Sequence, residues 1–207
     1  MSYDSDIHHR RSIRLRHYDY AAAGAYFVTI CVQERESLFG TIAEGVMRLN
    51  DAGRMVADLW AGLPARFPDL NLDEYAVMPN HFHGILVLTG RRGEPCVRPQ
   101  SQEGKTTGDH KDRENPGDHK DRPYGTRDGS IGRIMQAFKS LTTHAYIHGV
   151  THHQWQPFPG RLWQRNYYEH VIRDEAELHN ARQYIVDNPL RWEEDTENPA
   201  KRIKEPP

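Results

Sequence analysis

The chain has 207 residues, which is enough for one compact domain with a substantial core and too few for two large ones. Its formal net charge of −2 by itself argues against a nucleic-acid partner. No run approaches the roughly eighteen apolar residues of a membrane span, so no membrane partner is expected. The polar N-terminus lacks the apolar stretch of a secretory signal, and Cys31 and Cys96 lie in unlike settings, so we expect no disulfide and a cytoplasmic location.

The charges are unevenly distributed along the chain, so the net charge alone does not exclude a nucleic-acid partner. Residues 1–24 are predicted to form a basic N-terminal arm, and residues 131–173 contain five lysines and arginines against one acidic residue. A locally basic surface on a nearly neutral protein is compatible with DNA contact without requiring it. Four arginines carry the charge of the arm: Arg10, Arg11, Arg14 and Arg16.

The first half of the predicted domain alternates strand and helix periods. Residues 25–33 are aromatic and β-branched, which predicts a strand, and 38–49 has short apolar runs typical of a hairpin. Apolar residues at helical spacing predict a helix over 52–67. Two further core strands are expected at 72–78 and 81–89, separated by a Pro-Asn turn.

Residues 90–129 interrupt this pattern, because they are rich in Gly, Pro, Lys, Asp and Arg and nearly free of large apolar side chains. Such a segment cannot bury enough apolar surface to offset its ordering entropy, so we predict a disordered insertion or linker. The hexapeptide Gly-Asp-His-Lys-Asp-Arg occurs twice within it, at 108–113 and 117–122. A short duplication in a tolerant loop explains this repeat more simply than a metal site at His110 and His119.

The second half of the domain continues with a helix, a strand and a last helix. Ser130 is a suitable N-cap for the first of these helices, and residues 162–172 suggest the strand. Asp174, with Glu177 three residues later as in a capping box, begins the last helix, which Pro189 ends. The order of elements predicts one α+β domain over 25–192.

Its predicted fold is ferredoxin-like (split βαβ), with an antiparallel sheet, helices on one face and an added C-terminal helix. Residues 193–207 are predicted to be a flexible tail.

His81 and His83 are two residues apart in the predicted strand, so both imidazoles point to one face and Phe82 points to the other. Two neighbouring imidazoles can chelate a divalent cation. A His-x-His pair in a strand is nevertheless usually a half-exposed polar face, so spacing alone does not establish a metal site. Gly84 follows the pair, and a glycine there lets another backbone or a substrate approach closely.

In the last predicted helix, Tyr184 and Asn188 are four residues apart and share one face. The Asn188 carbonyl oxygen is a suitable hard ligand for Mg²⁺ or Mn²⁺. If this face lies over the histidines, the phenol can attack a metal-polarised phosphate, giving a 5′-phosphotyrosine linkage and a free 3′-hydroxyl. A packing tyrosine, with Asn188 as the helix C-cap, fits the same spacing and is the more common arrangement.

Five motifs occur in a characteristic order: RRSIRLRHYDY, AYFVTICVQERESLFG, VMPNHFHGILVL, WQRNYYEHVIRDE and ARQYIVDNPLRW. Together they resemble the REP-associated tyrosine transposases, a branch of the single-tyrosine HUH transposase superfamily. The resemblance covers about residues 10–192 apart from the insertion. It implies that Tyr184 is the catalytic nucleophile and that His81, His83 and Asn188 hold the Mg²⁺ or Mn²⁺ ion. Related enzymes often have a glutamine, one methylene longer, at the position of Asn188.

The resemblance predicts a transposase-like endonuclease and strand transferase for single-stranded DNA, active in DNA transposition or repeat mobilisation. Members of the family recognise hairpin DNA of a palindromic repeat with a short single-stranded guide sequence. A non-catalytic module that binds single-stranded DNA or RNA hairpins on its sheet is the alternative. A chelating pair beside a helix-borne tyrosine favours the enzyme. A zinc hydrolase fits poorly, because no third strong ligand has a recognisable spacing.

Several residues are expected to contact DNA besides the arginines of the N-terminal arm. Lys139 is predicted on the exposed side of its helix, and Arg165 and Asn166 stand beside two tyrosines. One of Tyr167 and Tyr168 must face outward and can stack on a base, and either is a competing nucleophile; we predict Tyr168 as the DNA contact. A monomer is favoured, because the last helix follows its strand closely, and a homodimer is possible.

Overall fold

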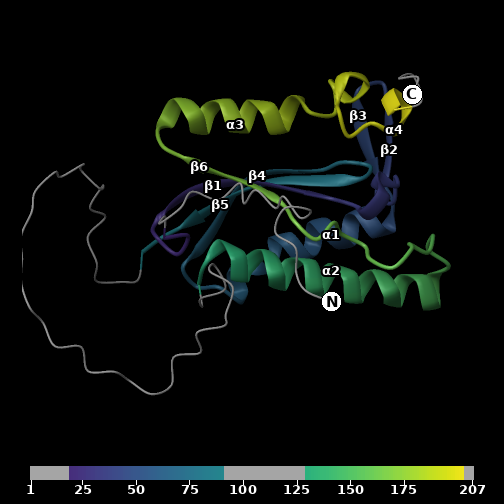
Figure 1. Cartoon of the computed structure of the whole chain (residues 1–207), viewed down its shortest axis with the longest axis horizontal. Coiled ribbons are helices and arrows are strands. Elements are labelled where there is room, and N and C mark those ends of the chain that lie inside the picture. The colour runs from purple at the N-terminus through teal and green to yellow at the C-terminus, as the bar shows by residue number, and fades with distance from the viewer. Residues whose placement is uncertain (1–18, 91–128, 203–207) are drawn as a thin grey trace, which may run out of the picture.

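A four-stranded antiparallel sheet forms the centre of the computed structural model, which describes residues 19–90 and 129–202 (Figure 1). The strands lie in the order β4-β5-β1-β6, with β5 and β1 in the middle. This is the strand order of the predicted ferredoxin-like fold, which is confirmed. The strands are β1 (Gly24–Cys31), β4 (Leu70–Val77), β5 (His81–Leu88) and β6 (Tyr168–Ile172).

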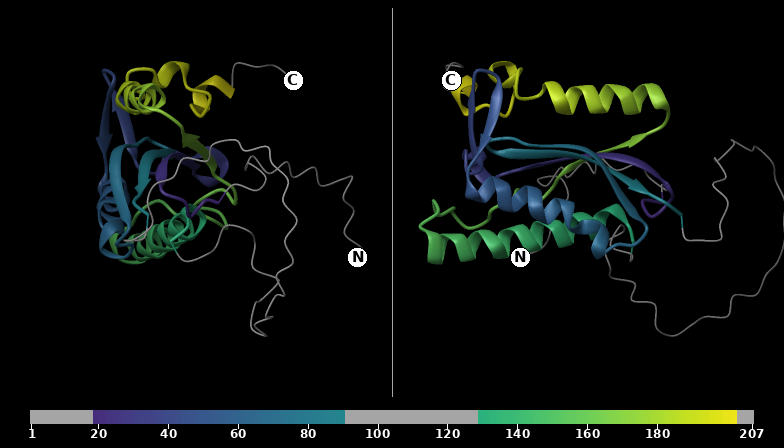
Figure 2. Two further views of the ribbon diagram at one scale, coloured as in Figure 1. Left: turned by 90° about the vertical axis from the view of Figure 1, so that its left-hand side faces the viewer. Right: turned by 180° about the vertical axis from the view of Figure 1, so that it is seen from behind.

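Helices cover both faces of this sheet. Helices α1 (Asp51–Ala61) and α2 (Ile131–His153) lie on one face, and α3 (Glu175–Asp187) lies alone on the other, as Figures 1 and 2 show from three sides. The added helix is therefore opposite the two helices of the ferredoxin-like unit. The smaller elements are η1 (Gln33–Arg35), β2 (Gly40–Ala43), β3 (Val46–Leu49), η2 (Leu63–Ala65), η3 (Trp192–Glu194) and α4 (Pro199–Arg202).

Each main helix begins at a polar side chain that accepts a backbone N–H of its first turn. Asn50 caps α1, Ser130 caps α2 and Asp174 caps α3, with acceptor distances of 2.9, 3.3 and 2.8 Å. Helix α1 ends at residue 61, earlier than the predicted residue 67. The reason is Pro64, which has no N–H to continue the helix and lies in the short turn η2.

The central strand β5 is buried on both faces. His81 and His83 lie on the face that α3 covers. Its Phe82 points the other way and packs against Trp60 and Phe138, with ring centroids 4.5 and 5.3 Å apart. Because successive strand residues alternate between faces, the core contact of Phe82 fixes the direction of both imidazoles. The predicted orientation of the pair is confirmed.

Gly84 has a different purpose from the one we predicted. A Cβ atom at this position would lie 2.5 Å from Cζ2 of Trp60, whose ring fills the space over the glycine. The close approach is therefore made by a core tryptophan and not by a substrate.

Strand β6 is shorter than the predicted 162–172, since residues 162–167 make only an isolated bridge, Val32 to Trp163. The ammonium group of Lys139 explains the difference. It donates to the carbonyl oxygens of residues 164, 165 and 166, at 2.6, 3.3 and 3.3 Å, and so holds them away from a strand ladder. Lys139 is thus enclosed by a loop, and the predicted exposed position is wrong.

The C-terminal segment also differs from its prediction. Residues 193–202, expected in a flexible tail, instead form η3 and α4, and the Asn198 amide donates to the Trp192 carbonyl at 2.9 Å. The segment turns back toward the sheet beside the end of α3 (Figure 1). Over the described ranges, the helices are too short or too polar to cross a bilayer.

Replacement of Gly84 tests the tight packing under the histidines. We expect Gly84→Ala to lower the free energy of unfolding by about 1–3 kcal/mol, because the added methyl overpacks a rigid indole. Gly62→Ala is the matched control, since Gly62 has φ −79° and a Cβ there would meet nothing nearer than 3.4 Å. Urea unfolding measures both. Equal stability of the two variants would contradict this packing.

Candidate active site between the sheet and helix α3

The two imidazoles lie side by side on the α3 face of β5. Their ring centroids are 4.6 Å apart and nearly perpendicular, and both side chains are buried. In each ring Nδ1 has a polar partner: Asn80 Oδ1 lies 2.9 Å from that of His81, and Thr29 Oγ1 lies 2.7 Å from that of His83. Both Nε2 atoms are buried without a hydrogen-bond partner. Such orphaned nitrogens are unfavourable unless something binds them.

A carboxylate from the C-terminal segment completes the cluster. Asp195 Oδ2 lies 3.7 Å from Nε2 of His81. One ligand atom from each of His81, His83 and Asp195 lies within 4.8 Å of the others. Two nitrogen ligands and a carboxylate oxygen this close together form a set that can hold a divalent cation.

Burial keeps the histidines neutral. It lowers the pKa of His81 to about 4, although the nearby Asp195 carboxylate opposes the shift. Burial also holds the pKa of His83 well below its ordinary value, and the neighbouring His81 lowers it further. Neutral imidazoles are the form that binds a metal, so protons do not compete for these nitrogens near neutral pH.

Apolar packing and the ion pair of Arg182 with Asp73 hold helix α3 over this face. Ile185 is buried in a cluster with Ile85 and Ile172. Near the middle of α3, the Arg182 guanidinium donates two hydrogen bonds to the Asp73 carboxylate of β4, at 2.8 and 2.5 Å. These contacts orient the helix, so that Tyr184 and Asn188 lie on the side of the histidines.

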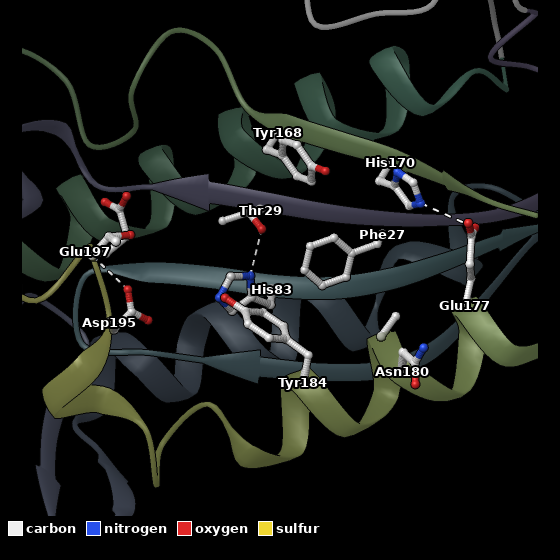
Figure 3. Close-up of a pocket in the computed structure, with 12 residues that line it drawn as sticks. Phe27, Thr29, His83, Tyr168, His170, Glu177, Asn180, Tyr184, Asp195 and Glu197 are labelled. Carbon is white, nitrogen blue, oxygen red and sulfur yellow. Dashed lines mark hydrogen bonds and ion pairs between the residues drawn. The ribbon is translucent and has the colours of Figure 1, made fainter.

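Tyr184 extends from α3 to the histidine pair (Figure 3). Its ring is edge-on to His83, with centroids 5.2 Å apart, and edge-on to Phe27 at 5.9 Å. The side chain is 45% exposed, so solvent reaches it. Burial of its remaining surface, followed by the negative charge of Asp195, raises the pKa of Tyr184. The phenol is therefore protonated at neutral pH in the absence of a cation.

Asn188 is both the C-cap residue of α3 and a neighbour of the site. Its side chain is buried, and Oδ1 forms no hydrogen bond of normal geometry. It lies close enough to His81 and Tyr184 to raise the pKa of the first and to lower that of the second, in each case against the larger effect of burial. The structure thus brings together the residues predicted as the site: His81, His83, Tyr184 and Asn188.

A pocket of about 540 Å³ opens beside Tyr184. Phe27 and Tyr168 form part of its wall, with rings in an edge-on contact at 6.3 Å. Its far end is polar, because His170 Nε2 lies 3.4 Å from Glu177 Oε2. Figure 3 shows Tyr168 and His170 on the strand side of this pocket and Tyr184 on the helix side.

The residues predicted to contact DNA fall into three groups. Tyr168 lines the pocket, and Arg165 and Asn166 are exposed just before it. Tyr167 packs against the core, and the Lys139 ammonium lies over it, 5.7 Å from the centroid of the Tyr167 ring. Tyr168 is therefore the tyrosine of this pair that faces outward. Burial lowers the pKa of Lys139 to about 8. The four arginines of the N-terminal arm, Arg10, Arg11, Arg14 and Arg16, lie outside the described residues.

The acidic residues of the C-terminal segment were not among the site residues predicted from the sequence. Asp195 and Glu197 line the same pocket as Tyr184 and His83 (Figure 3). A carboxylate a few residues beyond the helix that carries Tyr184 and Asn188 was the available signal, since carboxylates are common ligands of hard cations. The prediction of a flexible tail over residues 193–207 left this signal unused.

The sheet and site define a class: a ferredoxin-like domain whose histidine-bearing face is covered by a tyrosine-bearing helix. An uncharacterized protein of Haemophilus influenzae is 38% identical to this chain over 196 residues, which is 93% of this chain and 95% of the relative. The chain belongs to the same family as that protein. No family model matches it.

Among solved structures, a REP-associated tyrosine transposase bound to a REP hairpin is similar to this chain. The match covers 87% of this chain and 74% of the transposase, with a TM-score of 0.51 and 18% sequence identity. At this identity the likeness shows a common fold. The resemblance predicted from the motifs is confirmed at that level.

The neutral histidines give the protein a specific acid sensitivity. Because the pKa of His81 falls from 6.5 to about 4 on folding, the unfolded chain binds more protons between these values. The free energy of unfolding should therefore decrease as the pH falls from 6.5 to about 4, and His83 should act in the same direction. Chemical denaturation in the presence of a chelator measures this slope.

His81→Gln should make the slope shallower, because glutamine does not titrate, while the contribution of His83 remains. His179→Gln, a change at an exposed histidine of α3, should leave it unchanged. An unchanged slope in His81→Gln would show that the imidazole is not held neutral by the fold.

Proposed function

We propose that this protein is a transposase-like endonuclease and strand transferase that cleaves single-stranded DNA beside a hairpin. In this proposal Tyr184 is the nucleophile, and His81, His83 and Asn188 hold a divalent cation. We add Asp195 as a further ligand. The observation that carries the proposal is the convergence of two orphaned imidazole nitrogens and a carboxylate beside a half-exposed tyrosine.

The donor set fits Mg²⁺ or Mn²⁺. Carboxylate and amide oxygens suit both ions, and imidazole nitrogens suit the transition metal better. The site also leaves one side open, because the pocket reaches His83 and Tyr184. When bound, such a cation supplies positive charge that polarises the scissile phosphate and offsets the charge of Asp195.

Tyr184 can then carry out the covalent step. Its Oη forms a bond to phosphorus while the bond from phosphorus to the 3′-oxygen breaks. The phenolic proton passes to solvent, which reaches the half-exposed ring, and the leaving oxygen takes up a proton. The products are a 5′-phosphotyrosine and a free 3′-hydroxyl. Attack by another 3′-hydroxyl on this linkage reverses the step and joins the strands.

The position of Tyr184 supports a single-stranded substrate. Its phenol lies between α3 and the sheet, at a pocket of about 540 Å³, which has room for an unpaired nucleotide but not for a duplex. Phe27 and Tyr168 offer aromatic surfaces on which a base can stack. Arg165 and Asn166, exposed beside Tyr168, are suited to phosphate contacts.

Hairpin recognition and assembly are further parts of the proposal. The structural relative was solved with a REP hairpin, and we propose that this chain binds a hairpin of a palindromic repeat, with the basic N-terminal arm as an additional contact. Since α3 covers the sheet of its own chain, we propose that a monomer has a complete site. A DNA transposition or repeat-mobilisation activity of this kind would take place in the cytoplasm.

A covalent adduct tests this function. The full chain is incubated with Mn²⁺ and a labelled DNA hairpin that has single-stranded flanks, and the products are resolved on a denaturing gel. We expect an adduct with the unchanged protein and none with Tyr184→Phe, which lacks the attacking oxygen. Tyr75→Phe, at an exposed tyrosine of β4, should keep it. His81→Ala/His83→Ala should remove it, and a chelator should do the same.

The other outcomes are equally informative. An adduct that survives Tyr184→Phe would assign the nucleophile elsewhere, with Tyr168 as the next candidate. Tight hairpin binding without cleavage under any divalent cation would support the alternative, a non-catalytic hairpin-binding module.

A further inference from the structure

The side chain of Asn80 is fully buried in the turn that precedes β5, next to His81. Its Nδ2 donates two hydrogen bonds, to the carbonyl oxygens of Arg35 at 2.9 Å and of Glu197 at 2.8 Å. Both partners are backbone carbonyls, which can only accept. The nitrogen of the amide must therefore face them, and the orientation of the Asn80 amide is determined by its surroundings.

This orientation decides which tautomer the neutral His81 ring adopts. The Oδ1 atom of Asn80 faces His81 Nδ1 at 2.9 Å, and an amide oxygen can only accept a hydrogen bond. Nδ1 must therefore carry the proton of the neutral ring. The lone pair is left on Nε2, which forms no hydrogen bond of normal geometry and faces the Asp195 carboxylate at 3.7 Å and the Asn188 amide.

His83 has no equivalent constraint. Its Nδ1 lies 2.7 Å from the hydroxyl of Thr29, which can either donate or accept. Thr29 is therefore compatible with both tautomers of His83, whereas Asn80 is compatible with only one tautomer of His81.

The two carbonyls that hold Asn80 come from segments far apart in the chain. Arg35 has φ +60° and follows Glu34 with φ 61°, a backbone conformation that residues other than glycine rarely adopt. The Arg35 side chain then binds the other segment: its Nε lies 2.6 Å from Glu197 Oε2, and Nη1 donates to the Thr196 carbonyl at 3.4 Å. The η1 turn and the C-terminal segment are thus joined around Asn80.

We propose that Asn80 is a positioning residue that selects the tautomer of His81 able to bind a cation, and that its bond to the Glu197 carbonyl couples this choice to the docking of residues 195–198. The inference rests on the proposed function in one respect, that a divalent cation binds at His81 and His83. Asn80 itself touches neither the cation nor DNA. It acts through the imidazole, as hydrogen-bond partners of metal-binding histidines do.

The tautomer can be measured directly in the metal-free protein. Nitrogen-15 NMR correlation of the His81 ring at neutral pH, in the presence of a chelator, distinguishes a proton on Nδ1 from one on Nε2. We expect the proton on Nδ1. A proton on Nε2 would overturn the proposal, and this result does not depend on whether any variant folds.

Metal affinity provides the second test. We expect Asn80→Ala to bind Mn²⁺ about 10–100-fold more weakly than the unchanged full chain, measured by calorimetry or by the loss of the free-ion signal in electron paramagnetic resonance. Asn71→Ala, at an exposed asparagine of β4, is the matched control and should bind Mn²⁺ normally. Thermal unfolding with a chelator shows whether each variant is folded.

The outcomes separate the two proposals. If the unchanged protein binds no Mn²⁺, the metal site of the proposed function fails. If it binds Mn²⁺ and a folded Asn80→Ala binds it equally well, only the role of Asn80 fails. If Asn80→Ala does not fold, the tautomer measured in the unchanged protein decides.

Discussion

The contact between helix α3 and the histidine-bearing face of the sheet is the interaction on which the site depends. Burial of Ile185 between strand residues provides the apolar part of this contact, and the paired hydrogen bonds of Arg182 to Asp73 fix its direction. Without this docking, Tyr184 would be one exposed side chain among many, and the two imidazoles would face water. With this docking, the imidazoles are buried and neutral, and the Tyr184 phenol lies beside them.

This arrangement keeps polar groups in an unfavourable environment. The Nε2 atoms of His81 and His83 and the Oδ1 of Asn188 are buried without a hydrogen bond of normal geometry, although such groups usually reduce stability by about 1–3 kcal/mol each. The core on the opposite face is well suited to support them, since Trp60 and the aromatic rings around it are closely packed. Stability supplied by that core thus maintains a site prepared for a ligand.

Features set by local periodicity were predictable from the sequence. The alternation of strand residues placed His81 and His83 on one face, and the four-residue spacing of Tyr184 and Asn188 placed those two on one side of a helix. The order of strands and helices was sufficient for the fold. Periodicity does not show that the histidine face of β5 and the Tyr184 face of α3 meet, because this depends on the side of the sheet on which the last helix packs. The resemblance of the motifs was the basis for expecting them to meet.

Features set by contacts between distant segments were not predictable in this way. Lys139 lies on a helix face that periodicity leaves exposed, but a loop of three carbonyls covers its ammonium group. Asp195 reaches the histidines only because the chain turns back after α3. Glycine is needed at position 84 because the ring of Trp60, a residue of α1, leaves no room for a Cβ atom there. In each case the deciding partner is remote in sequence.

Anomalous diffraction from crystals grown with Mn²⁺ tests the central claim most directly. We expect one strong peak within bonding distance of Nε2 of His81 and of His83. An oxygen of Asp195 or Asn188 should be among its neighbours, and the Tyr184 hydroxyl of the same chain should face it. A peak bonded elsewhere, or a histidine pair covered by the helix of a second molecule, would contradict it.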